Sequence, residues 1–359
     1  MSEGNMARAE SLAMRQHEGI DYADSAIVAA GRGDSATVAR LLRDAPRAKP
    51  SSLAGSAFGI LVLLDEPIVA EPFARALSRV AARQPELSSA MTSMPLVMNL
   101  AAQGRRAEAD SILSSGPAGT SDPVGVIMGA MLAAAPFLNA PREALQAVRT
   151  RVSAFNPDAR PAVGPPRLLG AQMRLYLLGL LASRLDEPQE ALRRAAELEA
   201  LPVSAEYRYV PRSLAATVRA DVALSAGRAT EALEQLKVVR GATPLEFVDG
   251  FDPFTEEHAR FLRAEALDAL GRDDEALSWY ENGFSASFSM SFLYHAQAAR
   301  RLAEMYERRG ERAKAIEQYS RFVRMWAQCD PPLRPLVVEA RARLARLEGD
   351  RTPPVNRVR

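Results

Sequence analysis

Three histidines and one cysteine limit the chemistry that this 359-residue chain could perform. The lone Cys329 excludes an internal disulfide, a CxxC redox pair and a cysteine-based zinc site. His258 and His295, with Glu257, are a conceivable metal set, but no spacing specifies a fourth ligand. Capping or packing roles are the simpler interpretation of both histidines. The sequence therefore predicts no metal site.

Motifs of the common enzyme classes are also missing. The only lysines are Lys49, Lys237 and Lys314, and none follows a glycine, so there is no P-loop. The HRD and DFG motifs of protein kinases, and GxSxG, HExxH and GxGxxG, do not occur. Acidic residues such as Asp273 and Asp274 follow a turn glycine, where a helix dipole favours them. We expect a protein that is not an enzyme and uses no cofactor.

The charge balance is nearly neutral. With 45 basic and 44 acidic residues, the net charge is +1, which creates no overall attraction for nucleic acid or anionic lipid. We therefore expect neither of these as a partner. A hydrophobic content of 48% and a charged content of 25% are typical of a folded, soluble chain.

One uncharged stretch, residues 123–141, is long enough to cross a bilayer. Gly125, Gly129, Pro136 and Asn139 interrupt it, so we expect buried helices there instead of a membrane span. The polar first residues do not resemble a signal peptide, and the expected location is the cytoplasm.

Strong helix formers dominate the sequence, and three C-terminal segments share one pattern. In each, a small residue precedes a glycine by seven positions, an alanine follows it by five, and a bulky residue comes four later. These residues are Ala220, Gly227, Ala232 and Leu236; Ala264, Gly271, Ala276 and Tyr280; and Ala303, Gly310, Ala315 and Tyr319. The spacing predicts helix pairs, because glycine ends a helix readily and small residues let two helices cross closely.

Weaker copies of the pattern extend toward the N-terminus. Together with the three clear copies, they place turns at residues 33, 104, 139, 186, 227, 271 and 310. The step of 71 residues between the first two fits two units, and residues 50–85 still have the composition of a helix pair. We therefore expect about eight antiparallel helix pairs.

This pattern resembles the tetratricopeptide repeat. The resemblance implies an all-α fold, a right-handed α-solenoid whose superhelix has a concave groove. From about Phe254 onward, the chain is similar to the C-terminal repeat arrays attached to bacterial serine/threonine protein kinases and transcriptional activators. Trp326, the Asp330-Pro331 turn and a last helix over 336–347 carry that similarity. It implies a sensory or scaffolding array in bacterial signalling.

We expect one continuous array over residues 21–347, degenerate over 21–160 and clearer over 161–347. Residues 1–20 are a candidate capping helix, and residues 348–359 are expected to be a disordered tail.

Two groups of residues are candidates for partner binding. The repeat register places the first group toward the groove: Tyr176, Thr217, Asp221, Phe261, Glu265, Arg300 and Glu304. The second group, Tyr207, Tyr209 and Arg212, combines aromatic rings with a guanidinium and would suit a carboxylate, phosphate or nucleotide. The phenylalanine-rich loop 243–254 is either a peptide-docking lip or a seal between pairs. For both groups, plain surface and filler between repeats remain the alternatives.

The predicted function is a non-enzymatic scaffold that binds a protein or peptide partner in its groove. Two alternatives stay open: a structural subunit that self-associates head to tail, and a ligand-sensing array that regulates a kinase or transcription factor.

Overall fold

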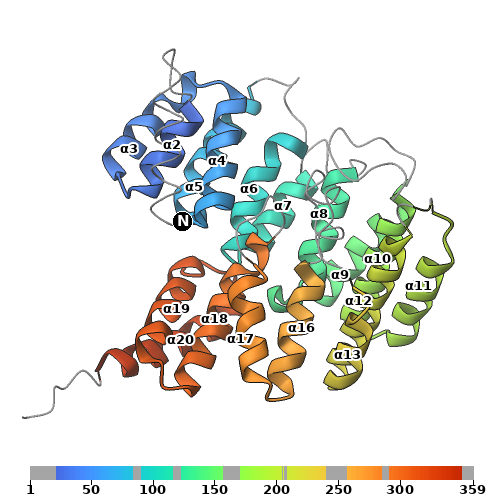
Figure 1. The fold of residues 1–359 in the computed structure, drawn as a ribbon. Helices are drawn as coiled ribbons and strands as arrows, with labels where there is room; N and C mark the ends of the chain where they lie inside the picture. Colours follow the sequence, from blue (N-terminus) through green and yellow to red (C-terminus); the bar gives the residue numbers. More distant parts are fainter. Residues whose placement is uncertain are drawn as a thin grey trace, which may run out of the picture.

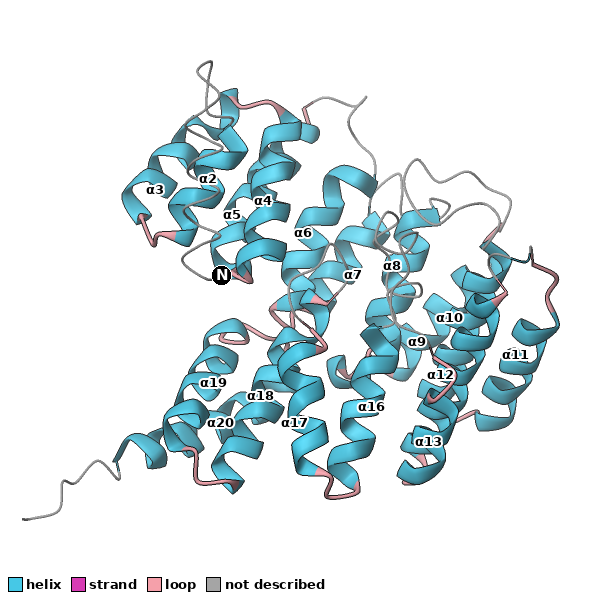
Figure 2. Cartoon of the chain, viewed as in Figure 1, coloured by secondary structure: helices cyan, strands magenta, loops and turns pink. Residues whose placement is uncertain are grey.

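A computed structural model describes residues 22–83, 90–115, 123–156, 170–203, 205, 208–239, 257–284 and 291–349. These ranges contain seventeen α-helices and no strand, so this part of the chain is all-α (Figure 2). The helices pack in consecutive pairs, and a single helix, α20, follows the eighth pair. The all-α prediction and the expected number of pairs are therefore confirmed for the described residues.

The pairs, in chain order, are α2 (Tyr22–Gly31) with α3 (Ser35–Asp44), α4 (Pro50–Leu64) with α5 (Pro67–Ala81), α6 (Ala90–Ala102) with α7 (Arg106–Ser115), α8 (Pro123–Ala134) with α9 (Arg142–Ala154), α10 (Gly170–Arg184) with α11 (Pro188–Ala200), α12 (Tyr209–Ser225) with α13 (Ala229–Leu236), α16 (Glu257–Ala269) with α17 (Asp273–Asn282), and α18 (Phe292–Arg308) with α19 (Arg312–Met325), before α20 (Arg334–Gly349). Short 3-10 turns, η1 (Ala45–Arg47), η3 (Pro136–Leu138) and η6 (Pro331–Leu333), lie between some of them.

The turn positions predicted from the repeat pattern are correct. All seven residues have positive φ, the left-handed conformation in which the residue after a helix commonly lies. At Gly227, the next amide, Arg228 N, donates to Ala223 O at 2.9 Å, which closes the helix end. An eighth residue, Asp65, also has positive φ (55°) and divides the 71-residue step into two units.

Small side chains lie where the two helices of a pair meet. The six alanines of the three C-terminal repeats are fully buried, at 0% exposure: Ala220, Ala232, Ala264, Ala276, Ala303 and Ala315. A larger side chain there would push the helix axes apart. The bulky repeat residues Leu236, Tyr280 and Tyr319 are buried as well, at 0–2% exposure.

The array curves so that its last helices return to an early pair. Figure 1 shows the first and last helices on the same side of the molecule, with α18 and α19 below α5 and α6. α18 packs on α6. Trp326, after α19, donates from Nε1 to Ala102 O at 3.1 Å. Asp330 N donates to Gly104 O at 3.0 Å, and Asp330 Oδ2 accepts from Ala107 N at 2.9 Å. The third helix pair is therefore joined to the segment after the eighth pair by direct hydrogen bonds.

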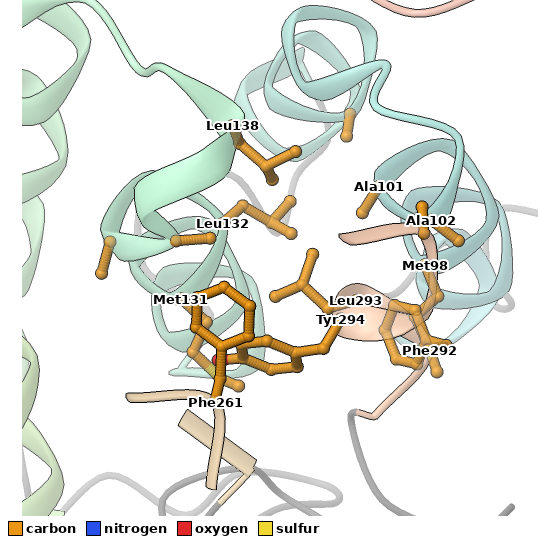
Figure 3. Close-up of a cluster of buried hydrophobic side chains, with 14 of the residues drawn as sticks. Met98, Ala101, Ala102, Met131, Leu132, Leu138, Phe261, Phe292, Leu293 and Tyr294 are labelled. Atoms are coloured by element: carbon orange, nitrogen blue, oxygen red, sulfur yellow. The ribbon is translucent and has the colours of Figure 1, made fainter. Parts of the chain in front are cut away.

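The space enclosed by this curve is filled with apolar side chains. In Figure 3, Phe261 of α16 and Tyr294 of α18 lie against Met131 and Leu132 of α8. Phe137 makes edge-to-face contacts with Phe261 and Tyr294, with centroids 5.3 and 5.5 Å apart. Helices far apart in the sequence thus share one core.

No helix of the described ranges is long and apolar enough to cross a membrane. The uncharged stretch instead forms α8 and η3, which break before Asn139.

Candidate functional site

Asp221 lies at the centre of a polar network buried inside the array. Ser183 Oγ donates to Asp221 Oδ2 at 2.5 Å, and Arg184 donates to Oδ1. His258 Nε2 lies 3.2 Å from the same Oδ1, and its Nδ1 lies 3.3 Å from the hydroxyl of Tyr294. We call these five residues the Asp221 network. It connects four helices: α10, α12, α16 and α18.

The charge of Asp221 is stabilised by its neighbours. The side chain is fully buried, which by itself raises its pKa, but the Arg184 guanidinium and the hydrogen bonds from His258 and Ser183 outweigh burial. Together they lower the pKa of Asp221 to about 2. The network therefore holds a buried ion pair at neutral pH, with hydrogen bonds on both carboxylate oxygens.

The order of contacts in the network is not that of a nucleophilic site. A catalytic serine donates its proton to a histidine, whereas Ser183 donates to the carboxylate of Asp221. Ser183 and His258 are also buried, at 8% and 2% exposure. This arrangement connects helices and positions their side chains.

A second polar group is partly accessible. Arg301 of α18 donates from Nε to Glu265 Oε1 of α16 at 2.7 Å, and its Nη1 lies 3.3 Å from Glu304 Oε2. Arg300 Nη1 donates to Glu304 Oε1 at 2.5 Å. We call Glu265, Arg300, Arg301 and Glu304 the ionic chain. Their side chains retain 16–27% exposure, so the ionic chain presents both signs of charge to solvent.

The ionic chain is anchored from beneath by a tyrosine. Tyr280 of α17 donates its hydroxyl to Glu265 Oε1 at 2.5 Å. Burial, followed by the negative charge of Glu265, raises the pKa of Tyr280 well above 10. The phenol therefore stays protonated and keeps Glu265 oriented toward Arg301.

The structure brings together only some of the predicted binding residues. Glu265, Arg300 and Glu304 meet in the ionic chain, through Arg301, which the sequence did not single out. Thr217 donates to Ser213 O at 2.8 Å within α12. The interior contains the remaining four members of the predicted groove group, at 0–5% exposure: Tyr176, Thr217, Asp221 and Phe261. The expectation that these four line an open groove is corrected, because all four are buried. Asp221 is enclosed by residues of α10 and α16, and Phe261 is covered by Phe137 and Tyr294.

The second predicted group is only partly described. Tyr209 is half-buried and Arg212 is exposed at the start of α12, whereas Tyr207 and the loop 243–254 lie outside the described residues. Whether either group binds a partner stays a prediction.

One polar group was not predicted from the sequence, although His295, one of its members, was considered there in other roles. His295 Nδ1 of α18 lies 2.5 Å from Asp65 Oδ1 at the end of α4, and Arg321 of α19 donates to Asp65 Oδ2. Arg324 Nη2 donates to Glu66 Oε1 at 3.1 Å beside them. We call Asp65, His295 and Arg321 the closing joint. A separation of 230 residues or more leaves no local pattern from which to predict it.

The two histidines considered as metal ligands engage different partners. His258 belongs to the Asp221 network and His295 to the closing joint. In the described part of the chain, no group of three or more His, Cys, Asp or Glu side chains could hold a metal ion.

Comparison with known proteins leaves the family open. No protein-family model matches the chain, and no curated protein matches it. The resemblance to tetratricopeptide repeats thus stays a prediction.

Proposed function

We propose that this protein is a non-enzymatic scaffold that binds a protein partner through the ionic chain of α16 and α18. The observation that carries the proposal is the partial exposure of four charged side chains from two neighbouring repeats, held in one fixed arrangement. A surface with both signs of charge selects a partner by its charge pattern, since a wrong partner brings like charges together.

The buried groups support the same function indirectly. The Asp221 network and the closing joint tie non-adjacent helices together, which keeps the ionic chain in one geometry. A rigid binding surface loses less conformational entropy when a partner docks. The self-assembling subunit and the ligand-sensing regulatory array stay alternative predictions, as does a role in bacterial signalling.

Affinity capture from an extract of the source cells tests this proposal. The bait is the full chain, compared with Arg300→Ala/Glu304→Ala and with the control Arg228→Ala/Glu231→Ala. The control pair is an exposed ion pair at the start of α13, with a separation of 2.6 Å and 51% exposure of both side chains. Circular dichroism is used to check that all three proteins are equally helical.

We expect a protein that the parent and the control capture and the ionic-chain variant does not. Equal capture by all three would exclude this surface as the binding site. Capture no greater than that of bare matrix would refute the scaffold itself.

A further inference from the structure

The last helix, α20, has one face without a neighbour in the described array. Val337 and Ala340 are buried on its inner side, where it packs on α19. Val338 points the other way and is 63% exposed, more than any other large hydrophobic residue of the described ranges. Ala342 and Ala345, four and seven positions later, are exposed and share the same face.

Two arginines border this apolar stripe. Arg334 and Arg341 lie four positions before and three positions after Val338, and both are exposed. Within the described residues, neither forms an ion pair, whereas Arg343 on another side of the helix pairs with Glu339 at 2.8 Å and Glu307 at 3.1 Å. A guanidinium with no ion pair can donate two parallel hydrogen bonds to a carboxylate. We call Arg334, Val338, Arg341, Ala342 and Ala345 the α20 outer face.

The net charge of this region also favours a negatively charged ligand. Residues 291–349 contain twelve basic and seven acidic residues, whereas the remainder of the sequence contains 33 basic and 37 acidic residues. The acidic residues of α20 are Glu339, which pairs with Arg343, and the exposed Glu348, two turns beyond Arg341. Among the described residues, neither forms an ion pair with Arg334 or Arg341. The end of the array thus attracts negative charge, although the whole chain is nearly neutral.

We propose that the α20 outer face docks an acidic amphipathic helix of a partner protein. Val338 and the two alanines contact the apolar side of that helix, because small side chains allow two helices to approach closely. Arg334 and Arg341, about two turns apart, pair with carboxylates on its flank. Two free arginines fall short of the clusters of about four to eight that bind anionic membranes, which favours a protein partner. This surface is distinct from the ionic chain, so the inference goes beyond the proposed function and does not depend on it.

Fluorescence anisotropy with a defined probe tests the inference. The probe is a labelled helical peptide of about 18 residues with one leucine stripe and glutamates on its flanks, and its counterpart carries lysine at every glutamate position. The proteins are the full chain, Arg334→Glu/Arg341→Glu, Val338→Asp, and the control Arg40→Glu/Arg43→Glu. Arg40 and Arg43 are exposed on α3, so the control makes the same charge change elsewhere.

We expect the glutamate peptide to bind the parent and the control, and the two α20 variants to bind it at least tenfold more weakly. The lysine peptide should not bind. Equal affinity for all four proteins, no binding of the glutamate peptide at about 200 μM, or equal binding of both peptides would overturn the proposal.

Two further measurements distinguish other occupants of the face. Co-sedimentation with phosphatidylserine vesicles that is lost in Arg334→Glu/Arg341→Glu would identify a membrane surface instead of a protein. A dimer in light scattering that the same variant dissociates would identify a second copy of this chain. Either result would replace the acidic helix as the occupant.

Discussion

Asp65 and His295 are 230 positions apart in the sequence, yet His295 Nδ1 lies 2.5 Å from Asp65 Oδ1. Their contact, with Arg321 on the other carboxylate oxygen, joins the second helix pair to the eighth. Burial works to raise the pKa of Asp65, but the hydrogen bonds and charges of His295 and Arg321 outweigh it and lower the pKa. The joint therefore gives the carboxylate of Asp65 a stabilising role at neutral pH.

We predict that Asp65→Asn lowers the free energy of unfolding by about 1.5–3 kcal/mol at neutral pH, the usual contribution of hydrogen bonds to charged groups. Asparagine tolerates the positive φ of this position, so the change removes the charge without adding backbone strain. Urea unfolding followed by circular dichroism measures the effect.

Asp186→Asn is the matched control for this change. Asp186 has the same type of turn conformation, with φ of 62°, but is exposed and forms no ion pair within the described structure. An equal loss of stability in both variants would show that the turn, and not the joint, is responsible.

Gly104 provides a second test of the contact between distant helix pairs, here the third and the eighth. A Cβ at this position would lie 3.1 Å from Cys329 Cβ and from ring atoms of Trp326. At Gly227, which has nearly the same φ, a Cβ would meet nothing within 4 Å. Gly104→Ala and Gly227→Ala should share the cost of a left-handed alanine, about 1–2 kcal/mol.

Gly104→Ala should lower the free energy of unfolding by about 1–3 kcal/mol more than Gly227→Ala does, because its methyl group forces the end of α19 away from α6. Thermal and urea unfolding of the two variants give the difference. Identical midpoints would mean that the closed arrangement adds no constraint at Gly104.

The Asp221 network makes a pH-dependent contribution to stability. Because the pKa of Asp221 falls from 3.8 to about 2 on folding, its stabilisation is complete above pH 3.8 and is lost as the pH falls through the folded value. Asp221→Asn keeps the shape but removes the charge that faces Arg184. We expect a loss of about 3 kcal/mol near pH 7, and a smaller difference from the parent near pH 3.

At Asp110, the dependence of stability on pH should have the opposite sign. Burial raises the pKa of Asp110 despite the nearby charges of Arg106 and Arg151. Its ionised form is therefore disfavoured by folding, and the parent gains stability relative to Asp110→Asn as the pH falls. Urea midpoints of both variants between about pH 7 and pH 3 check the two trends. Parallel trends would contradict the assigned environments.

The repeat register predicts which alanines resist enlargement. Ala276 and Ala315 are fully buried at helix crossings, whereas Ala269 is exposed at the end of α16. Leucine at either buried site should cost about 1–3 kcal/mol or more, because it overpacks the contact between paired helices. Ala269→Leu should leave the urea midpoint nearly unchanged. If all three variants shift the midpoint equally, the register does not describe the packing.

Local sequence was sufficient for the helices and their turns. Every predicted turn, from Gly33 to Gly310, adopts positive φ, since this conformation depends on the residue and on the hydrogen bonds of its own helix end. The burial of the alanines at the helix crossings was also predictable, because their spacing reflects contacts between helices adjacent in sequence. Asp65 was missed because the repeat pattern fades over residues 50–85, so no spaced alanine pointed to a turn there.

The surroundings of the candidate sites depended on contacts between distant helices. From sequence alone, Asp221 and Phe261 were assigned to an open groove, because the register specifies the face of a helix but not what covers that face. In the tertiary structure, α10 and α16 enclose Asp221, and Phe137 and Tyr294 cover Phe261. Of the residues assigned to the groove, Glu265, Arg300 and Glu304 stay partly accessible. The curvature of the array sums small rotations over eight pairs, so it depends on every interface together and on no single motif. Helix positions were therefore determined by short-range spacing, whereas the closing joint and the filled interior were decided by the tertiary structure.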